Sequence, residues 1–163
     1  LTPYLTAYRT WASYEAESAG VAIAYTSVYG HTKEAALLLA DTLRAAGVRT
    51  EVFDLARDDM AAAVAAAFRY DRLVLATTTY NADLFPFMRT FIEHLCERGF
   101  KGRRVGFIEN GSWAPRAALL MRAMFEKSVD LTFAEPVVTL RSALSPESHA
   151  SLLKLADWLI GKC

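Results

Sequence analysis

The chain lacks several features that would set it apart from ordinary globular proteins. It has only two cysteines, Cys96 and Cys163, in 163 residues, so no disulfide framework is indicated and a reducing compartment, by default the cytoplasm, is predicted. It has no excess of charge, because 18 basic side chains offset 18 acidic ones. Nucleic acid is therefore not an expected partner. No apolar run approaches the ~20 residues that cross a bilayer, so no membrane segment is predicted.

What the chain does have is the composition of a single folded domain. Hydrophobic residues make up 53% of it and charged residues 22%, the balance of a domain with a substantial buried core. Residues 1–19 begin with Leu and carry no pattern of a signal peptide. We expect them to be a linker, or the end of a missing N-terminal domain, and residues 20–163 to form the domain itself.

Short charge-free runs alternate with helical patterns along residues 20–163. Such runs suit strands that are buried on both faces of a parallel sheet. Pro136 lacks a ladder donor, which places the last strand at an edge, and Ser145 followed by Pro146 predicts the start of the last helix. The expected strands cover 21–25, 48–55, 72–76, 104–109 and 131–140, and the expected helices cover 32–46, 58–68, 87–98, 116–127 and 146–160. This order predicts a three-layer α/β sandwich with helices on both faces.

Ligands of open parallel sheets bind beyond the carboxyl ends of the strands, and the loop after the first strand is rich in hydroxyl groups. It reads TSVYGHT over residues 26–32 and leads directly into a helix, whose N-terminus favours an anion. The loop has neither the spacing of a nucleoside-triphosphate loop nor that of a dinucleotide fold, so a phosphate monoester is the better match. The alternative is that its Ser and Thr residues only cap the helix.

The loops after the third and fourth strands each bring one aromatic residue to the same edge. They read TTTYNAD over residues 77–83 and NGSW over residues 110–113, and they carry Tyr80 and Trp113. Two aromatic side chains with small polar neighbours could hold a planar ring. The alternative is hydrophobic packing of each ring at a helix entrance.

These segments resemble a known family. The string IAYTSVYGHT resembles the phosphate loop of flavodoxin-like FMN domains, and TTTYNADLFPFM resembles the ring-binding loop of one branch, the flavodiiron proteins or type A flavoproteins. The resemblance covers about residues 20–161, and LTAYRTW resembles the segment that joins this domain to an N-terminal metallo-β-lactamase-like diiron domain. It implies a flavodoxin-like three-layer sandwich with a five-stranded parallel sheet in the order 2-1-3-4-5.

The resemblance also implies which residues bind the cofactor, FMN. The first loop would hold the phosphate, and the other two would surround the isoalloxazine ring. Three departures from the family pattern are His31 where Asn is common, Thr78 where Pro is frequent, and NGSW where SYGW is frequent. The implied residues are Thr26, Ser27, Val28, Tyr29, Gly30, His31 and Thr32 in the first loop, and Thr79, Tyr80, Asn81, Asn110, Gly111, Ser112 and Trp113 in the others.

The function implied by the resemblance is electron transfer. A reductase or rubredoxin-like donor would pass electrons through FMN to a diiron site that reduces oxygen or nitric oxide, in a protein that is a homodimer when full length. The chain's histidines, His31, His94 and His149, lie in separate segments, so we expect the metals in the missing domain and no catalytic side chain here.

Two other readings stay open at this stage. One is a self-contained FMN-dependent NAD(P)H quinone reductase of the same fold, which would turn over without a partner domain. The other is a cofactor-free receiver domain of the response-regulator type. Receivers need clustered carboxylates at the end of the first strand to bind Mg²⁺, and Tyr25, Thr26 and Ser27 stand there instead, so this reading is the weaker one.

Asp83 and Glu109 are the carboxylates that the predicted loops bring nearest to the flavin. A negative charge there disfavours reduction to an anionic flavin, although we expect Glu109 to be a solvated surface charge. We predict that Asp83→Asn raises the potential of the second electron transfer to bound FMN in a redox titration. An unchanged or lowered potential would remove Asp83 from this role.

Overall fold

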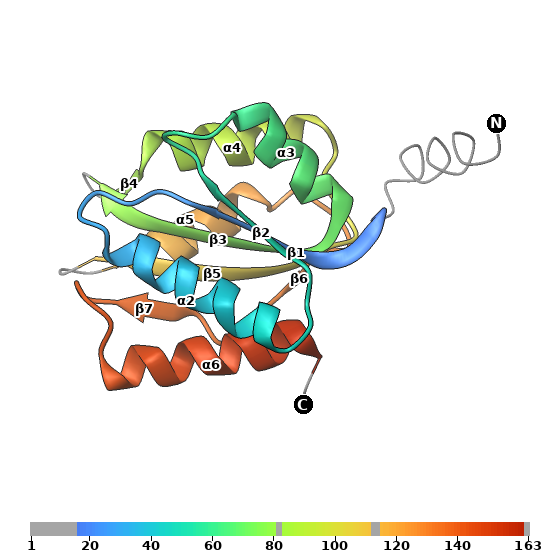
Figure 1. Cartoon of the computed structure of the whole chain (residues 1–163). Helices are drawn as coiled ribbons and strands as arrows, with labels where there is room; N and C mark the ends of the chain where they lie inside the picture. Colours follow the sequence, from blue (N-terminus) through green and yellow to red (C-terminus); the bar gives the residue numbers. More distant parts are fainter. Residues whose placement is uncertain (1–15, 81–82, 112–114, 162–163) are drawn as a thin grey trace.

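The computed structural model describes residues 16–80, 83–111 and 115–161, and strands and helices alternate along them (Figure 1). Each helix follows a strand, and each helix except α6, the last element, leads into another strand. The strands are β1 (Ser18–Tyr25), β2 (Thr50–Asp54), β3 (Tyr70–Tyr80), β4 (Asp83–Leu84), β5 (Arg104–Asn110), β6 (Thr132–Phe133) and β7 (Val138–Leu140). The helices are α2 (His31–Ala45), α3 (Met60–Arg69), α4 (Pro86–Glu97), α5 (Ala117–Met124) and α6 (Pro146–Ile160).

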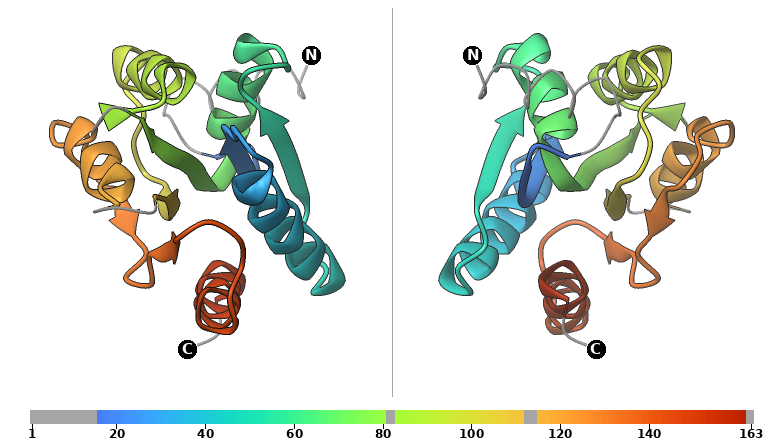
Figure 2. Two further views of the ribbon diagram at one scale, coloured as in Figure 1. Left: turned by 90° about the vertical axis from the view of Figure 1, so that its left-hand side faces the viewer. Right: turned by 90° about the vertical axis from the view of Figure 1, so that its right-hand side faces the viewer.

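The sheet has the predicted topology. Its strands follow the order β2-β1-β3-β5-β6, and β7 also pairs with β5, so both pieces of the predicted last strand lie at that edge. All of these pairs are parallel, whereas β4 is antiparallel to β3. Figure 2 shows α2 and α6 on one face of the sheet and α3, α4 and α5 on the other. The three-layer α/β sandwich is confirmed.

Several predicted bounds differ from the structure: β1 begins at Ser18, α5 ends at Met124, and two predicted strands are wrong in ways that have a clear cause. β3 runs on to Tyr80 instead of ending at Ala76, because Thr77 and Thr78 continue the parallel pairing with β5. The single strand expected over residues 131–140 is instead divided into β6 and β7. Pro136 lies between these two pieces, where it has no N–H to donate to the β5 ladder.

Alternate residues of the central strands supply two separate cores. Leu73, Leu75 and Phe107 pack with α3, α4 and α5. Val74, Ala76 and Ile108 pack with α2 and α6 on the other face. Because successive side chains of a strand point to opposite faces, each central strand contributes to both cores and its register is fixed on both sides.

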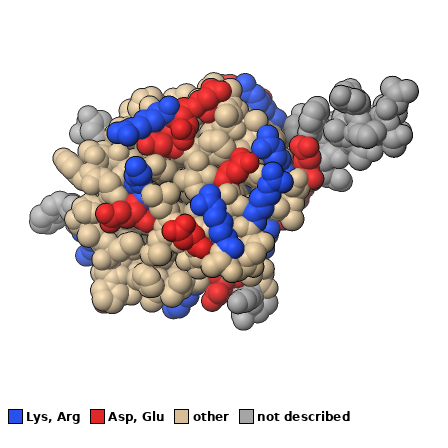
Figure 3. Space-filling view, in the orientation of Figure 1, with Lys and Arg blue, Asp and Glu red and all other residues tan. Residues whose placement is uncertain are grey.

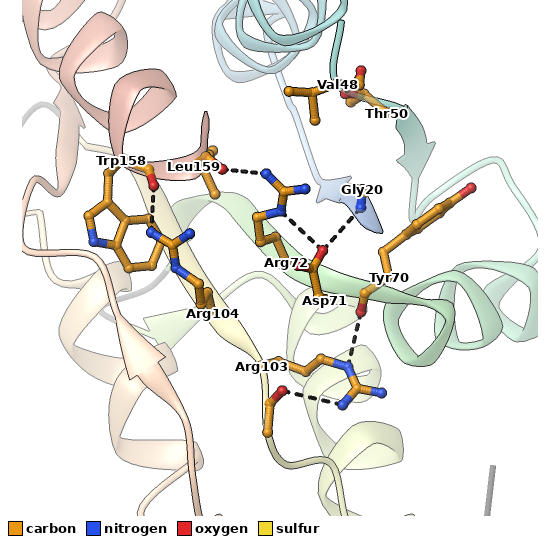
Figure 4. A network of polar contacts seen from close by, with 11 residues as sticks. Gly20, Val48, Thr50, Tyr70, Asp71, Arg72, Arg103, Arg104, Trp158 and Leu159 are labelled. Carbon is orange, nitrogen blue, oxygen red and sulfur yellow. Dashed lines mark hydrogen bonds and ion pairs between the residues drawn. The ribbon is translucent and has the colours of Figure 1, made fainter. Parts of the chain in front are cut away.

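Arginine side chains close the amino edge of the sheet (Figure 4). Arg103 is only 2% exposed, and its guanidinium donates to the carbonyl oxygens of Phe68 at 2.8 Å, Tyr70 at 3.0 Å and Lys101 at 2.8 Å. Desolvation lowers the pKa of Arg103, and the charge of Asp71 partly opposes this effect. The Phe68 carbonyl lies in the last turn of α3, where free carbonyl groups attract a cation.

The same edge holds the end of α6. Arg104 donates to the carbonyl of Trp158 at 2.5 Å and lies 4.2 Å from the centre of its indole ring. Arg72 donates to the carbonyl of Leu159 and to Asp71, whose carboxylate also accepts the N–H of Gly20 at 3.0 Å. These bonds join β1, β3, β5 and α6 at one end of the domain.

We predict that Arg103→Met lowers the free energy of unfolding by about 3 kcal/mol, because several buried carbonyls lose a charged donor at once. Urea unfolding followed by circular dichroism measures the change. The matched control is Arg98→Met, since Arg98 is exposed and donates to the His94 carbonyl within its own helix. The control should stay within about 0.5 kcal/mol of the unchanged chain. Equal losses of unfolding free energy in both variants would contradict the structural role that we assign to Arg103.

Candidate cofactor site

A cavity of about 400 Å³ opens at the carboxyl edge of the sheet, a volume within the range of small-molecule sites. It is bounded by the segments that follow β1 and β7, by the last residues of β3, and by the end of β5 with the residue after it. The predicted residues that line it are Ser27, Val28, Tyr29, His31, Thr32, Thr79, Asn110 and Gly111. Thr78 and Ser142 also line it and were not predicted as site residues.

The turn before α2 leaves the start of that helix open. Gly30 is the N-cap, with φ 90° and ψ −10°, and no side chain caps the helix. The Ser27 hydroxyl instead accepts the N–H of Gly30 at 3.0 Å. The alternative that this loop's hydroxyls only cap the helix is therefore wrong, and the first-turn N–H groups can serve a ligand.

α3, α5 and α6 do not share this open start, whereas α4 also begins without a side-chain cap but has Pro86 in its first turn and does not line the cavity. Asp59 caps α3 by accepting the N–H of Ala61, and Ser145 forms a capping box with Ser148 at α6, as its position before Pro146 predicts. The first turn of α5 receives a carboxylate from Glu109, which accepts the N–H of Ala118 at 2.9 Å. The N-terminus that faces the cavity is thus left without the cap that these helices have.

His31 and Thr32 form the first turn of α2 beside the cavity. The Nδ1 atom of His31 is buried and has no hydrogen-bond partner in the described part of the chain, which is costly for a polar atom. Thr32 is 1% exposed, and its hydroxyl accepts from the Asn110 side-chain amide at 3.4 Å. An anionic occupant with several oxygen atoms would satisfy the open N–H groups and the imidazole together.

Asn110 lines the cavity and connects three segments through hydrogen bonds. Its side-chain amide also donates to the Ser142 carbonyl at 3.2 Å, and its oxygen accepts the N–H of Ser142 at 3.3 Å. Ser142 has φ 120°, a backbone conformation that non-glycine residues rarely adopt. Sequence reasoning missed Ser142, since one serine after an edge strand carries no distinguishing signal.

Thr26 does not line the cavity. It is 1% exposed, and its hydroxyl lies 2.5 Å from that of Thr77 on the neighbouring strand. This bond joins the ends of β1 and β3 beneath the loops. The predicted role of Thr26 as a cofactor ligand therefore has a structural alternative, in which Thr26 positions the loop that follows it.

The second and third loops are described in part. The Thr79 hydroxyl accepts the N–H of Arg116 at 3.3 Å, and Gly111 donates to the Leu140 carbonyl at 3.0 Å. A Cβ atom on Gly111 would lie 3.3 Å from Pro115, so the chain is closely packed here. Tyr80 ends β3. The predicted site residues Asn81, Ser112 and Trp113 lie outside the described residues.

Glu109 and Asp83, the two carboxylates predicted near the flavin, differ in their burial. Glu109 is buried, and the Thr139 hydroxyl donates to it at 2.9 Å in addition to the N–H from α5. The expectation of a solvated surface charge is therefore wrong. Asp83 is exposed; the Leu84 N–H and then the Arg89 guanidinium lower its pKa. Arg89 also offsets part of the field that Asp83 exerts on a ligand.

The electrostatic surroundings are mixed. On the face seen in Figure 3, basic and acidic side chains are interspersed.

Among the described residues, no three His, Cys, Asp or Glu side chains gather where they could hold a metal ion. Within the described ranges, no helix has both the length and the apolar character needed to cross a bilayer.

The chain is an α/β protein with a parallel sheet. At the carboxyl edge of this sheet, an open helix start and a hydroxyl-lined cavity are suited to a phosphate-bearing ligand. The model of the flavodoxin family matches residues 23–140. The chain therefore belongs to the flavodoxin family, whose members are FMN-binding electron-transfer domains, and this membership implies FMN as the cofactor. No match to the sequence was found among curated proteins.

Solved structures share the fold at low sequence identity. The rubredoxin oxygen:oxidoreductase of Desulfovibrio gigas has a TM-score of 0.80 at 13% identity, over 96% of this chain and 40% of its own. A flavo-diiron protein variant from Thermotoga maritima has a TM-score of 0.79 at 18% identity, over 97% and 40%. A flavodoxin from Streptococcus pneumoniae has a TM-score of 0.75 at 23% identity, over 89% and 100%. This chain thus spans about 40% of the length of the first two.

We predict that Gly30→Ala lowers the free energy of unfolding by about 1 kcal/mol, because a side chain disfavours the left-handed conformation. It should also weaken FMN binding roughly tenfold, because the displaced turn no longer aims its N–H groups at the phosphate. Urea unfolding and quenching of flavin fluorescence measure the two effects.

The matched control is Gly161→Ala. Gly161 also has φ 90° and, like Gly30, has open space where a Cβ atom would lie, but it ends α6. The control should lose similar stability and keep its FMN affinity. Equal affinity in both variants would show that the Gly30 turn does not hold the phosphate.

Proposed function

We propose that this chain is the FMN-binding electron-transfer domain of a flavodiiron protein. It would receive electrons from a reductase or rubredoxin-like donor and pass them to a diiron site that reduces oxygen or nitric oxide. The observation that carries FMN binding is the uncapped start of α2 beside the cavity. The site also matches the chemistry of a phosphate, since it offers N–H groups, hydroxyls and the imidazole ring of His31.

The residues present fit FMN. The turn at Gly30 and the first turn of α2 would hold the phosphate, and Asn110 would hold the surrounding segments in place through Thr32 and Ser142. Thr79 would fix the entrance of α5 through the Arg116 N–H. FMN, when bound, supplies the redox chemistry, so the chain needs only to bind it, orient it and shape its surroundings.

The flavodiiron assignment has its own support. The likeness to the two flavodiiron-type structures extends over 96% and 97% of this chain, compared with 89% for the flavodoxin. The segment LTAYRTW, which resembles the joint to a diiron domain, lies in the part that a plain flavodoxin would not need. In the full-length protein we propose a homodimer, in which the flavin serves the diiron domain of the same or the partner subunit.

The test of FMN binding begins with the chain freed of flavin. It is mixed with FMN, passed over a gel-filtration column and reduced stepwise without oxygen while its visible spectrum is recorded. We expect flavin bands that co-elute with the protein and that reduce and reoxidise reversibly. Loss of all flavin on the column, with the circular dichroism of a folded chain, would contradict the proposed function.

The electron donor is tested on the FMN-loaded chain. We expect reduced rubredoxin to reduce the bound flavin in a stopped-flow mixing experiment. Steady oxidation of NADH or NADPH in the presence of a quinone should not exceed that caused by the same amount of free FMN. Rapid turnover with NAD(P)H and quinone would instead favour the self-contained quinone reductase.

A further inference from the structure

The cavity contains one side chain that is able to carry a positive charge at neutral pH. Of its described lining residues, only His31 is basic, and the Tyr29 phenol is the only other ionisable group. The undescribed residues of the neighbouring loops, 81–82 and 112–114, include no Lys, Arg or His. A phosphate monoester carries a charge of about −1.5 to −2 at pH 7. The charge of the ligand is thus met by dipoles and by one imidazole.

His31 is placed to act on that charge. It is the first residue of α2, next to the turn at Gly30, and it lines the cavity at the helix N-terminus, where an anion is favoured. Its Nδ1 atom has no hydrogen-bond partner among the residues that the structure describes. A phosphate oxygen that accepts a proton from this ring would form a charge-assisted hydrogen bond, which is about twice as strong as a neutral one.

No other ionisable group facing α2 is suited to this role. The elements that pack on α2 are β1, β2, β3, β5 and α6. Glu109 of β5 is turned toward α5, and the Tyr25 hydroxyl of β1 donates to Asp54 of β2 at 3.5 Å. The remaining groups at this end, Lys33, Glu34, Arg141 and Glu147, are exposed. Carboxyl, phenol, ammonium and guanidinium groups ordinarily keep their charge between pH 6.5 and 8.5, whereas imidazole ordinarily changes it.

We propose that His31 selects the phosphorylated flavin, FMN, over riboflavin, and that its protonation makes FMN binding stronger as the pH falls. This inference rests on the proposed function, because it concerns the same cavity. Bound phosphate favours the protonated imidazole, so by linkage protonation must favour bound phosphate. His31 therefore acts as a specificity-determining residue whose contribution increases toward pH 6.5 and disappears toward pH 8.5.

The experiment measures the Kd of FMN and of riboflavin by fluorescence quenching at pH 6.5 and 8.5, a range in which the phosphate stays mostly dianionic. For the unchanged chain we expect FMN to bind roughly tenfold more tightly at pH 6.5 than at pH 8.5. Riboflavin, which has no phosphate, should change by less than about twofold.

The test variant is His31→Asn, which keeps a donor but cannot be charged. It should bind FMN with nearly the same Kd at both pH values and should discriminate less against riboflavin at pH 6.5. The matched control is His149→Asn, because His149 is exposed on α6 and does not line the cavity. The control should keep the full pH dependence, and circular dichroism checks that both variants fold.

The possible results separate the two proposals. If His31→Asn binds FMN with an unchanged pH dependence, the inference is overturned while the proposed function stands. If riboflavin shows the same pH dependence as FMN, the effect does not act through the phosphate, and the inference is again overturned. If neither flavin binds to the folded, unchanged chain, both the proposed function and this inference fail.

Discussion

The parallel pairing of β1, β3 and β5 is the constraint on which the rest of the structure depends. It brings the carboxyl ends of these strands to one edge, so the loops that follow them meet although they lie about 50 to 80 residues apart, as Thr32 and Asn110 do. The pairing is held in place because successive side chains pack into two cores on opposite faces. A shift of one residue would move each of these side chains to the opposite core, where it would not match its neighbours.

Helix ends have different hydrogen-bond partners at the two edges of the sheet. At the amino edge, Arg103 and Arg104 donate to the last carbonyls of α3 and α6, so the negative ends of these helices are neutralised within the domain. At the carboxyl edge, α3, α5 and α6 have partners for their first turn, whereas α2 and α4 begin without a side-chain cap, and of these two only α2 lines the cavity. The domain thus closes most of its helix ends and leaves one positive end facing a cavity. This asymmetry explains how a chain without net charge can hold an anion.

Much of this could be predicted from the sequence because the relevant signals are local. Charge-free runs indicated buried parallel strands, and Ser145 with Pro146 marked the start of α6. The hydroxyl-rich loop with Gly30 was placed at the start of a helix for the same reason. Where the prediction failed, the cause was a contact between distant segments. Glu109 was predicted to be a surface charge, but its carboxylate accepts hydrogen bonds from the start of α5 and from Thr139.

The sequence by itself determined the class of fold and the identity of the loops that meet at one edge, while the order of the strands was implied by the resemblance to flavodoxin-like domains. The class of fold follows from periodicity, from the right-handed connection of parallel strands and from residues with special backbone preferences, all of which act over short stretches of chain. Only the tertiary structure decided which side chains of those loops face the cavity. The Thr26 hydroxyl is hydrogen-bonded to that of Thr77, and Ser142 is hydrogen-bonded to Asn110. The Nδ1 atom of His31 has no partner among the described residues. Each outcome depends on which atoms from distant segments are within hydrogen-bond distance, and that is set by how the layers pack.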